Sequence, residues 1–390
     1  MQQKDGRVVA ALEGRITSNN AGEWQEKLTR ALDEAPGKGL TLDAEKLDYI
    51  SSAGLRVLLS LTKRLKGDVE VVNVSPEVYE VFEMTGFADM MKVVKRLRRF
   101  SVEGCEVVGR GAIGTVYRVD EDTIVKVYEI PDSLPMIENE QKRAKQAFLK
   151  GIPTAISYDV VQVGDKYGSV FEMLKASTYN DLLVAQPERQ DELVRQYAHF
   201  VRSIHEVEMD PGELPEAKDV FLGYLDELKA VLPEALHGRL RALVEAMPAD
   251  MHVVHGDIQM KNVMVSDGEP LLIDMDTLSA GDPVFDFAGL YVTYKIFNED
   301  EPDNTEKFLG LSKEHCDRLW EAFMRAYFDD REAPADAEVR IQIAAYVRFL
   351  FLVAALGIGI PGIRQARIDH AVERLTQLTA KVERLALAAE

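Results

Sequence analysis

Acidic and amide side chains gather in His255-Gly256-Asp257-Ile258-Gln259-Met260-Lys261-Asn262 and again in Leu271-Leu272-Ile273-Asp274-Met275-Asp276. The segments 253–255, 262–265 and 271–273 are apolar and rich in β-branched residues, which predicts short strands with the polar residues in the turns between them. A carboxylate, an amide five residues later and a second carboxylate after a hairpin can aim a base at a hydroxyl and hold Mg²⁺ on a nucleotide's phosphates. This favours phosphoryl transfer, because that reaction depends on positioning and charge neutralisation.

The pattern H-G-D-x-x-x-x-N followed by I-D resembles the catalytic core of the aminoglycoside-phosphotransferase and choline-kinase group of small-molecule kinases, whose fold is kinase-like. The resemblance implies that Asp257 is the catalytic base, that Asn262 is a metal ligand and that Asp274 is the metal-binding aspartate. It also implies ATP and Mg²⁺ as cofactors. The alternative is a hairpin rich in turn formers, since Asp, Asn and Gly favour turns in any protein.

Other residues are expected to support this core rather than to react. His255 opens the motif and is placed beside the reacting groups. Asp276 would share one face of a strand with Asp274, where it either touches a second metal ion or shapes the turn. The segment 281–288 resembles the family's G-D-P-x-x-D-x-A sequence, which implies that Asp286 braces the catalytic loop from a following helix.

A glycine-rich turn lies upstream, between two β-like runs within 107–117. A G-x-G-x-x-G pattern alone is a weak signal, but here a second strand and then Lys126 follow it, which favours a kinase over a dinucleotide-binding fold. Glycines would let the backbone approach the phosphates, and Lys126 would bring positive charge to the α- and β-phosphates. The glycines concerned are Gly109, Gly111 and Gly114.

A buried lysine needs a carboxylate to orient it. The helix that begins near Ile137 is expected to supply Glu140, with Glu138 as the alternative. The strand 168–174 resembles the hinge between the two lobes of a kinase. That resemblance implies that the backbone from Glu172 to Leu174 hydrogen-bonds adenine.

One position separates the branches of this fold. Protein kinases usually have Lys two residues after the catalytic Asp, and many aminoglycoside-type kinases have His, whereas this chain has Gln259. The sequence H-G-D, the replacement of D-F-G by I-D-M-D and the lack of A-P-E favour the small-molecule branch.

The C-terminal part of the chain is predicted to be helical over the segments 188–207, 319–328, 337–356 and 368–388. The apolar run 349–363 is predicted to be a buried helix. The acidic loop 298–304 is expected to be solvated, although acidic groups near a pocket would suit a cationic acceptor.

The first 95 residues alternate β-like runs with the helical patterns 21–32, 55–65 and 76–85, which predicts a small α/β unit. The sequence Tyr-Ile-Ser-Ser-Ala-Gly-Leu-Arg-Val-Leu-Leu at 49–59 resembles the STAS domain, the fold of anti-sigma-factor antagonists. In that family a regulatory phosphoserine follows an Asp at the start of this helix; the aligned residue is Ser52, and Ser51 stands where the Asp usually is. The alternative is that Ser52 only caps the helix.

The composition fits these assignments. The chain has 390 residues, 46% hydrophobic and 29% charged, enough for about two to three domains. A net charge of −20 disfavours nucleic acid and anionic membranes as partners, and two distant cysteines suit a cytoplasmic protein. We predict an STAS domain (1–95, mixed sheet with helices), a linker (96–103), and a bilobal α+β kinase-like domain with an N-lobe (104–175) and a mostly helical C-lobe (176–390).

Three functions remain open at this point. The first is an ATP- and Mg²⁺-dependent phosphotransferase acting on a hydroxyl of a small molecule, with a regulatory STAS domain. The second is a regulatory kinase that phosphorylates a serine of an STAS domain, either Ser52 itself or one in a partner protein. The third is a nucleotide-gated interaction module without catalysis. The sequence does not name the acceptor.

Overall fold

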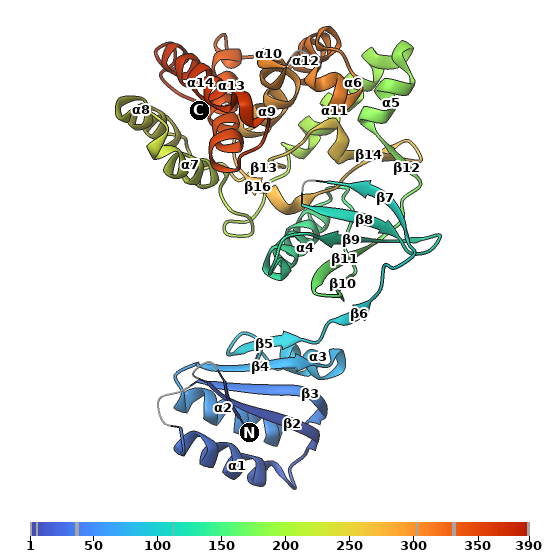
Figure 1. Cartoon of the computed structure of the whole chain (residues 1–390), viewed down its shortest axis with the longest axis vertical. Coiled ribbons are helices and arrows are strands. Elements are labelled where there is room, and N and C mark those ends of the chain that lie inside the picture. Colours follow the sequence, from blue (N-terminus) through green and yellow to red (C-terminus); the bar gives the residue numbers. More distant parts are fainter. Residues whose placement is uncertain are drawn as a thin grey trace. The chain divides into compact units, whose positions relative to one another are not determined.

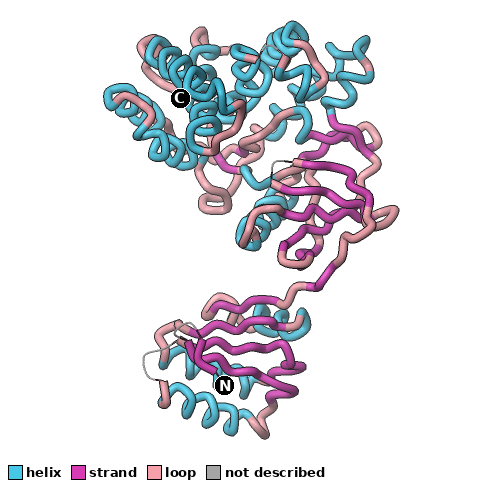
Figure 2. Tube along the Cα trace, viewed as in Figure 1, coloured by secondary structure: helices cyan, strands magenta, loops and turns pink. Residues whose placement is uncertain are grey.

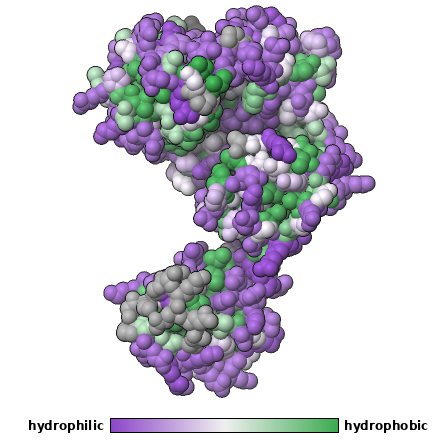
Figure 3. Space-filling view, viewed as in Figure 1, coloured by the Kyte–Doolittle hydropathy of each residue, from purple (hydrophilic) through white to green (hydrophobic). Residues whose placement is uncertain are grey.

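The structure is a computed structural model that describes residues 2–4, 7–35, 39–111, 113–301, 303–329 and 333–387. The chain forms two compact units, Met1–Ser101 with Val160–Asp165 and Val102–Asp159 with Lys166–Glu390 (Figure 1). Hydrophilic residues dominate the face drawn in Figure 3, as expected for a chain with a net charge of −20. Within the described ranges, no helix combines the length and the apolar character needed to cross a bilayer.

The first unit is an α/β sandwich of one sheet and its helices, as predicted. Its sheet has the order β1-β2-β3-β4-β5, with β1 antiparallel to β2 and the other neighbours parallel. Parallel neighbours need crossovers, which the helices between them provide (Figure 1). The elements are β1 (Gln2–Lys4), β2 (Arg7–Ile16), α1 (Ala21–Asp33), β3 (Leu40–Ile50), α2 (Ser52–Arg64), β4 (Val69–Val74), α3 (Pro76–Met84) and β5 (Lys92–Lys95).

The segment predicted as a linker, 96–103, is not wholly irregular. It contains the strand β6 (Arg98–Phe100), which pairs in parallel with β10 (Asp159–Val163). The strand predicted at Leu40 is also longer than expected, because β3 runs to Ile50 beside the long β2 with register shifts along the pair.

The second unit begins with an antiparallel sheet in the order β11-β9-β8-β7. The helix α4 packs against β11 and against the turn Met275–Thr277. Its amphipathic pattern buries Ile137, Glu140, Ala144 and Ala147. The elements are β7 (Glu106–Arg110), β8 (Gly114–Arg118), β9 (Thr123–Tyr128), α4 (Leu134–Leu149) and β11 (Lys166–Glu172).

The rest of the second unit is mainly helical, which confirms the predicted class (Figure 2). Tyr197, Phe287 and Phe349 are among the fully buried side chains of its core. Its strands are β12 (Ala176–Thr178), β13 (Val253–Val254), β14 (Val263–Ser266), β15 (Glu269–Leu272) and β16 (Ser279–Ala280). Its helices are α5 (Tyr179–Ala185), α6 (Gln190–Ile204), α7 (Ala217–Glu227), α8 (Glu234–Glu245), α9 (Val284–Tyr291), α10 (Phe297–Asp300), α11 (Asn304–Leu309), α12 (Lys313–Tyr327), α13 (Ala337–Leu350) and α14 (Arg364–Thr379).

Two predictions about the C-terminal region are wrong, and a third holds only in part. The apolar run 349–363 is not one buried helix: α13 ends at Leu350, a π-helical turn spans Phe351–Ala355, and the glycines that follow lie in a loop with exposed Leu356 and Ile358. The last helix, α14, ends at Thr379 rather than Ala388. The acidic segment 298–304 is exposed at Glu299, Asp300 and Asp303, as expected, but it is not all loop, since it contains helix α10 and the start of α11, and Arg367 pairs with Glu301.

Candidate active site

Lys126 on β9 lies between two carboxylates. Its Nζ is 3.5 Å from Oε1 of Glu140 on α4, and it contacts Oδ1 of Asp274 directly. Burial alone would lower the pKa of Lys126, but Glu140 and Asp274 outweigh it and raise the pKa. The lysine is therefore held charged in a partly buried site, at 15% side-chain exposure.

Glu140, not Glu138, occupies the position that orients Lys126. Glu140 is 6% exposed and accepts a hydrogen bond of 2.7 Å from the hydroxyl of Tyr128. Glu138 is exposed and borders a surface hollow with Lys142. Sequence reasoning missed Tyr128, although its place on the same face of β9 as Lys126, two residues away, was a usable signal.

The glycine-rich turn joins β7 to β8. Gly109 belongs to β7, Gly111 donates its N–H to the carbonyl of Gly114 at 2.9 Å, and Ala112 lies outside the described residues. A Cβ on Gly114 would stand 2.5 Å from the carbonyl oxygen of Val127. Close packing on β9 therefore already requires a glycine at 114, whatever binds above the turn.

The catalytic-loop motif forms a tight turn around Asp257. Nδ2 of Asn262 donates to Oδ2 of Asp257 at 2.9 Å and to its backbone carbonyl at 2.8 Å, and Nε2 of Gln259 donates to Oδ2 at 3.0 Å. The hairpin β14–β15 follows through Asp267-Gly268, both with positive φ, as a type I′ turn requires. The N–H of Ile273 then donates to the carbonyl of Asn262 at 3.0 Å, which brings Asp274 back beside the loop.

Asp286 holds the loop from α9. Its carboxylate accepts the N–H of His255 at 2.9 Å and that of Gly256 at 2.6 Å, and it contacts Nε2 of His205 at 2.9 Å. Burial alone would raise the pKa of Asp286, but the hydrogen bond and charge of His205 outweigh it and lower the pKa. The geometry is that of a brace, as the sequence predicted, and His205 is an anchor that the sequence left unassigned.

Asp274 and Asp276 do not share a strand. The strand β15 ends at Leu272, Asp274 has φ 65° and ψ 61°, and Asp276 lies in a 3₁₀ turn, so the expected common face is wrong. Arg143 donates to the backbone carbonyl of Asp276. Burial, with added repulsion from Asp274 and Glu140, raises the pKa of the Asp276 carboxyl to about 6.

His255 is buried and serves the backbone around it. Its Nε2 lies 3.0 Å from the carbonyl of Ile273, and its own carbonyl accepts the hydroxyl of Thr277 at 2.8 Å. It thus ties the two polar segments together without a place among the reacting groups. At the expected hinge, Glu172 ends β11 and Leu174 follows in the coil after Met173, whose N–H donates to the carbonyl of Asp122 at 2.8 Å.

Arg348 of α13 is the residue that sequence reasoning missed entirely. Its Nη2 is 3.2 Å from Oδ1 of Asp257, and its Nη1 donates to the carbonyl of Gly256. Arg348 follows Asp257 by 91 residues inside an apolar helix, and no local pattern marks it. Such a contact is visible only after the helices have packed.

The donor set fits Mg²⁺. The Asn262 amide nitrogen is bonded to Asp257, which leaves its Oδ1 as an oxygen donor, and Asp274 adds a carboxylate that is 40% exposed. Mg²⁺ is commonly bound by one or two such protein oxygens together with phosphates and water. Within the described part of the chain, no cluster of three or more His, Cys, Asp and Glu side chains could hold a metal without such outside ligands.

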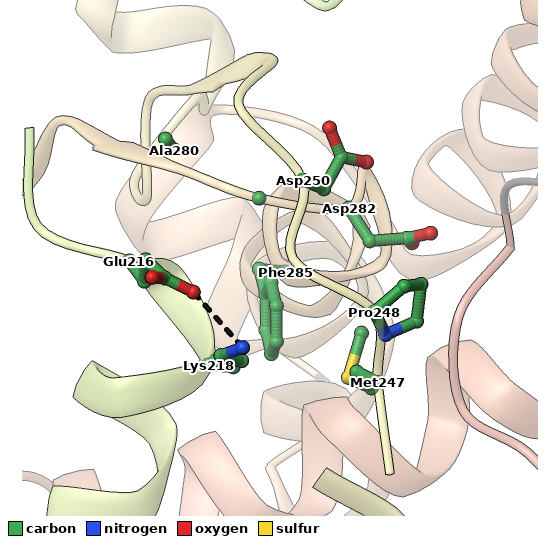
Figure 4. A pocket seen from close by; sticks show the side chains of 9 residues that line it. Glu216, Lys218, Met247, Pro248, Asp250, Ala280, Asp282 and Phe285 are labelled. Carbon is green, nitrogen blue, oxygen red and sulfur yellow. Dashed lines mark ion pairs between the residues drawn. The ribbon is translucent and has the colours of Figure 1, made fainter. Parts of the chain in front are cut away.

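A small cavity near the base of α9 does not belong to this site. It measures about 10 Å³ and is bordered by Phe285, Asp282 and the ion pair between Glu216 and Lys218, whose charged atoms are 3.0 Å apart (Figure 4). That volume is about the space of one water molecule and excludes any substrate.

Comparisons with known proteins identify the family of each part of the chain. The profile of the phosphotransferase enzyme family matches residues 104–337, and that of the STAS domain matches residues 1–99. A candidate anti-sigma factor antagonist of Bordetella bronchiseptica, BtrV, is 38% identical over 96 residues, which is 24% of this chain and 82% of that protein.

Solved structures to which the chain shows similarity include a thermostable mutant of the aminoglycoside phosphotransferase APH(4)-Ia in its apo form. It is 14% identical with a TM-score of 0.49, over 71% of this chain and 94% of that one. A choline/ethanolamine kinase family protein from Mesorhizobium loti is 18% identical with a TM-score of 0.45, over 70% and 87% of the two chains. The family match covers more than half of the sequence. The chain therefore belongs to the phosphotransferase enzyme family and carries an STAS domain at its N-terminal end.

Proposed function

We propose that this protein is an ATP- and Mg²⁺-dependent phosphotransferase that moves the γ-phosphate to a hydroxyl group of a small molecule, under the control of its STAS domain. One observation carries the proposal. The hydrogen bond between Ile273 and Asn262 joins the loop of Asp257 to the segment of Asp274, which Lys126 contacts from the sheet. The family that the chain belongs to supports the same reaction class.

The reaction needs few groups. Asp257 takes the proton of the acceptor hydroxyl while the acceptor oxygen attacks the γ-phosphorus. The bond between the γ-phosphorus and the oxygen that bridges it to the β-phosphate breaks, and ADP leaves. Mg²⁺ held by Asn262 and Asp274 would neutralise charge on the phosphates. Lys126 would hold the α- and β-phosphates, and the turn at Gly109, Gly111 and Gly114 would cover them. Glu172 to Leu174 would meet the adenine.

The test uses the full chain with MgATP and a panel of hydroxyl-bearing acceptors, with ADP release and product ³¹P spectra as readouts. We expect Asp257→Ala and Asp274→Ala to lower acceptor-stimulated turnover by about 10²–10⁴-fold. Asp226→Ala, which removes an exposed partner of Arg241, is the control and should turn over ATP normally. Turnover that persists unchanged in both site variants would contradict the proposal.

We also propose that the protein is cytoplasmic. The two free cysteines, Cys105 and Cys316, suit that reducing compartment.

A second candidate function is phosphorylation of Ser52 or of a serine in a partner's STAS domain. The observation that favours it is the arrangement of the two serines at the start of α2. Ser51 caps the helix by accepting the N–H of Gly54, so Ser52, the first helical residue, is exposed and is not used as the cap. A phosphate there would meet the positive end of the helix. Incubation with labelled ATP and mapping by mass spectrometry decides it: label at Ser52 that disappears in Asp257→Ala supports it, and unlabelled residues 1–95 contradict the self-directed form.

A further inference from the structure

Arg348 contacts the carboxylate that the proposed function uses as its base. It lies in the last turn of α13, with Nη2 3.2 Å from Oδ1 of Asp257 and Nη1 bonded to the carbonyl of Gly256. Its side chain is 12% exposed. One guanidinium thus holds both the carboxylate and the backbone that carries it, which is the fork geometry that arginine provides and lysine does not.

The other carboxylate oxygen is held from the opposite side. Oδ2 of Asp257 accepts from Asn262 at 2.9 Å and from Gln259 at 3.0 Å. With Arg348 on Oδ1, rotation of the carboxylate is fixed by contacts on both oxygens. Precise orientation of a base matters because a misplacement of about 1 Å can lower a rate about 10²-fold.

Arg348 also supplies charge that the loop itself lacks. The loop's lysine, Lys261, donates to the carbonyl of Phe308 and lies 4.1 Å from the centre of that ring, so it is turned elsewhere. Gln259 is neutral. Among the described residues, Arg348 is the cation that forms an ion pair with Asp257. A base that must work beside a triphosphate benefits from such a charge, because carboxylate and phosphates repel each other.

Arg348 lies between α9 and the π-helical turn that follows α13. A Cβ on Gly289 of α9 would lie 3.6 Å from Cζ of Arg348, an ordinary van der Waals distance, so α9 packs directly against the guanidinium. The π-helical turn Phe351–Ala355 begins directly after α13, and such turns are frequent at functional sites. Arg348 lies beyond the family match at 104–337.

We propose that Arg348 is a positioning residue for phosphoryl transfer: it fixes Asp257 in the orientation that receives the acceptor proton and offsets the charge of that carboxylate. The inference rests on the proposed role of Asp257. It adds a residue, outside the matched family segment, on which the rate of the chemical step depends.

The variants are Arg348→Ala and Arg348→Lys in the full chain. The matched control is Arg340→Ala on the same helix, because Arg340 is 5% exposed and also holds a backbone carbonyl (Ala386, 2.6 Å) and a carboxylate (Asp336, 2.6 Å). Arg340→Ala therefore removes the same two kinds of contact as Arg348→Ala, but at a place that does not touch Asp257. The kcat and KM for MgATP are measured with water as the acceptor, with and without guanidinium chloride at about 20 mM, far below denaturing concentrations.

For Arg348→Ala we expect kcat to fall about 100-fold while the KM for ATP changes by less than about threefold. Added guanidinium should raise the kcat of Arg348→Ala about tenfold. The kcat of Arg348→Lys should lie between those of the wild type and Arg348→Ala, because lysine keeps the positive charge but lacks the two-pronged guanidinium. Arg340→Ala should be less stable than the wild type. At temperatures below its melting range its kcat should stay within about threefold of the wild-type value, and added guanidinium should not raise it. A kcat for Arg348→Ala within threefold of wild type, or an equal unrescued loss in both alanine variants, overturns the proposal.

A double-mutant cycle separates this inference from the proposed function. The unfolding midpoints of wild type, Arg348→Ala, Asp257→Ala and the double variant are compared. Non-additive shifts support the contact even in a preparation that turns over no ATP, in which case the proposed function fails. Additive shifts overturn the inference, and normal ATP turnover by the wild type in the same preparation would leave the proposed function standing.

Discussion

The carboxylate of Asp286 accepts the backbone N–H of Gly256 at 2.6 Å, so a helix that follows the catalytic loop holds the residue directly before Asp257. Its other oxygen holds His255 and contacts His205. Asp286 is completely buried. The loop is thus positioned by one desolvated carboxylate.

Asp286→Asn should destabilise the protein by about 2–4 kcal/mol at pH 7, because it removes one partner of a buried, charge-assisted set of hydrogen bonds. The lowered pKa of Asp286 in the folded protein means that its stabilising contribution is present above an unfolded value of about 3.9 and is lost as the pH falls through the folded pKa. Denaturant titrations at pH 7 and pH 3 measure the free energy of unfolding of both proteins. The difference between wild type and Asp286→Asn should be smaller at pH 3 than at pH 7. Asp226→Asn, an exposed ion-pair partner, should change stability by less than about 1 kcal/mol; a gap at Asp286 that stays constant with pH would contradict the assignment.

Gly256→Ala should disable the site far more than Gly268→Ala. Both glycines have positive φ, +81° and +87°, so both substitutions cost about 1 kcal/mol or more in backbone strain. Only at Gly256 would the new Cβ lie 2.7 Å from the carbonyl of Thr277, whereas nothing lies within 4 Å at Gly268. Thermal unfolding and ATP turnover of the two variants check this, and equal effects would show that the close contact with Thr277 is relaxed without consequence.

The two serines at the start of α2 should behave differently. Ser51→Ala removes the cap on Gly54 and should cost about 1 kcal/mol, while Ser52→Ala should be nearly neutral because Ser52 is exposed. Ser52→Glu should be neutral or slightly stabilising, since it places a negative charge at the helix N-terminus. Chemical denaturation of the full chain compares them. A larger loss at Ser52 than at Ser51 would reverse the assignment of the cap.

Lys126→Met should weaken ATP binding and lower turnover by about 10²-fold or more, because it removes the cation from between Glu140 and Asp274. It also leaves Glu140 buried without its charged partner, so some loss of stability is expected. Binding of a fluorescent ATP analogue and ADP release measure the two effects. Lys166→Met, which breaks an exposed pair with Glu129, is the control and should change neither; normal nucleotide affinity in Lys126→Met would exclude a phosphate-binding role.

The local chemistry of the site could be predicted from the sequence because its groups are close along the chain. Asp257, Gln259 and Asn262 lie in one turn and contact one another there. The same is true of the α2 start, where Ser51 and Gly54 are three residues apart. Turn formers, caps and short apolar strands are local properties, and local interactions dictate them.

Choices between equivalent residues needed the packed structure. Glu138 and Glu140 are alike in sequence, and only the facing of α4 buries one of them beside Lys126. The expectation that Asp274 and Asp276 share a strand face failed because Asp274 takes a left-handed conformation directly after β15. The helix predicted over 349–363 failed because its glycines end the regular structure beyond the π-helical turn.

By itself, the sequence determined the two-domain architecture, the reaction class suggested by the ordered motifs, and the residues that meet within one turn. Tertiary structure alone decided which distant side chains reach that turn: His205 and Asp286 beneath it, and Arg348 against the carboxylate of Asp257. The physical reason is that an ion pair across 91 residues depends on how α13 packs against α9, and no local preference of the chain encodes that packing.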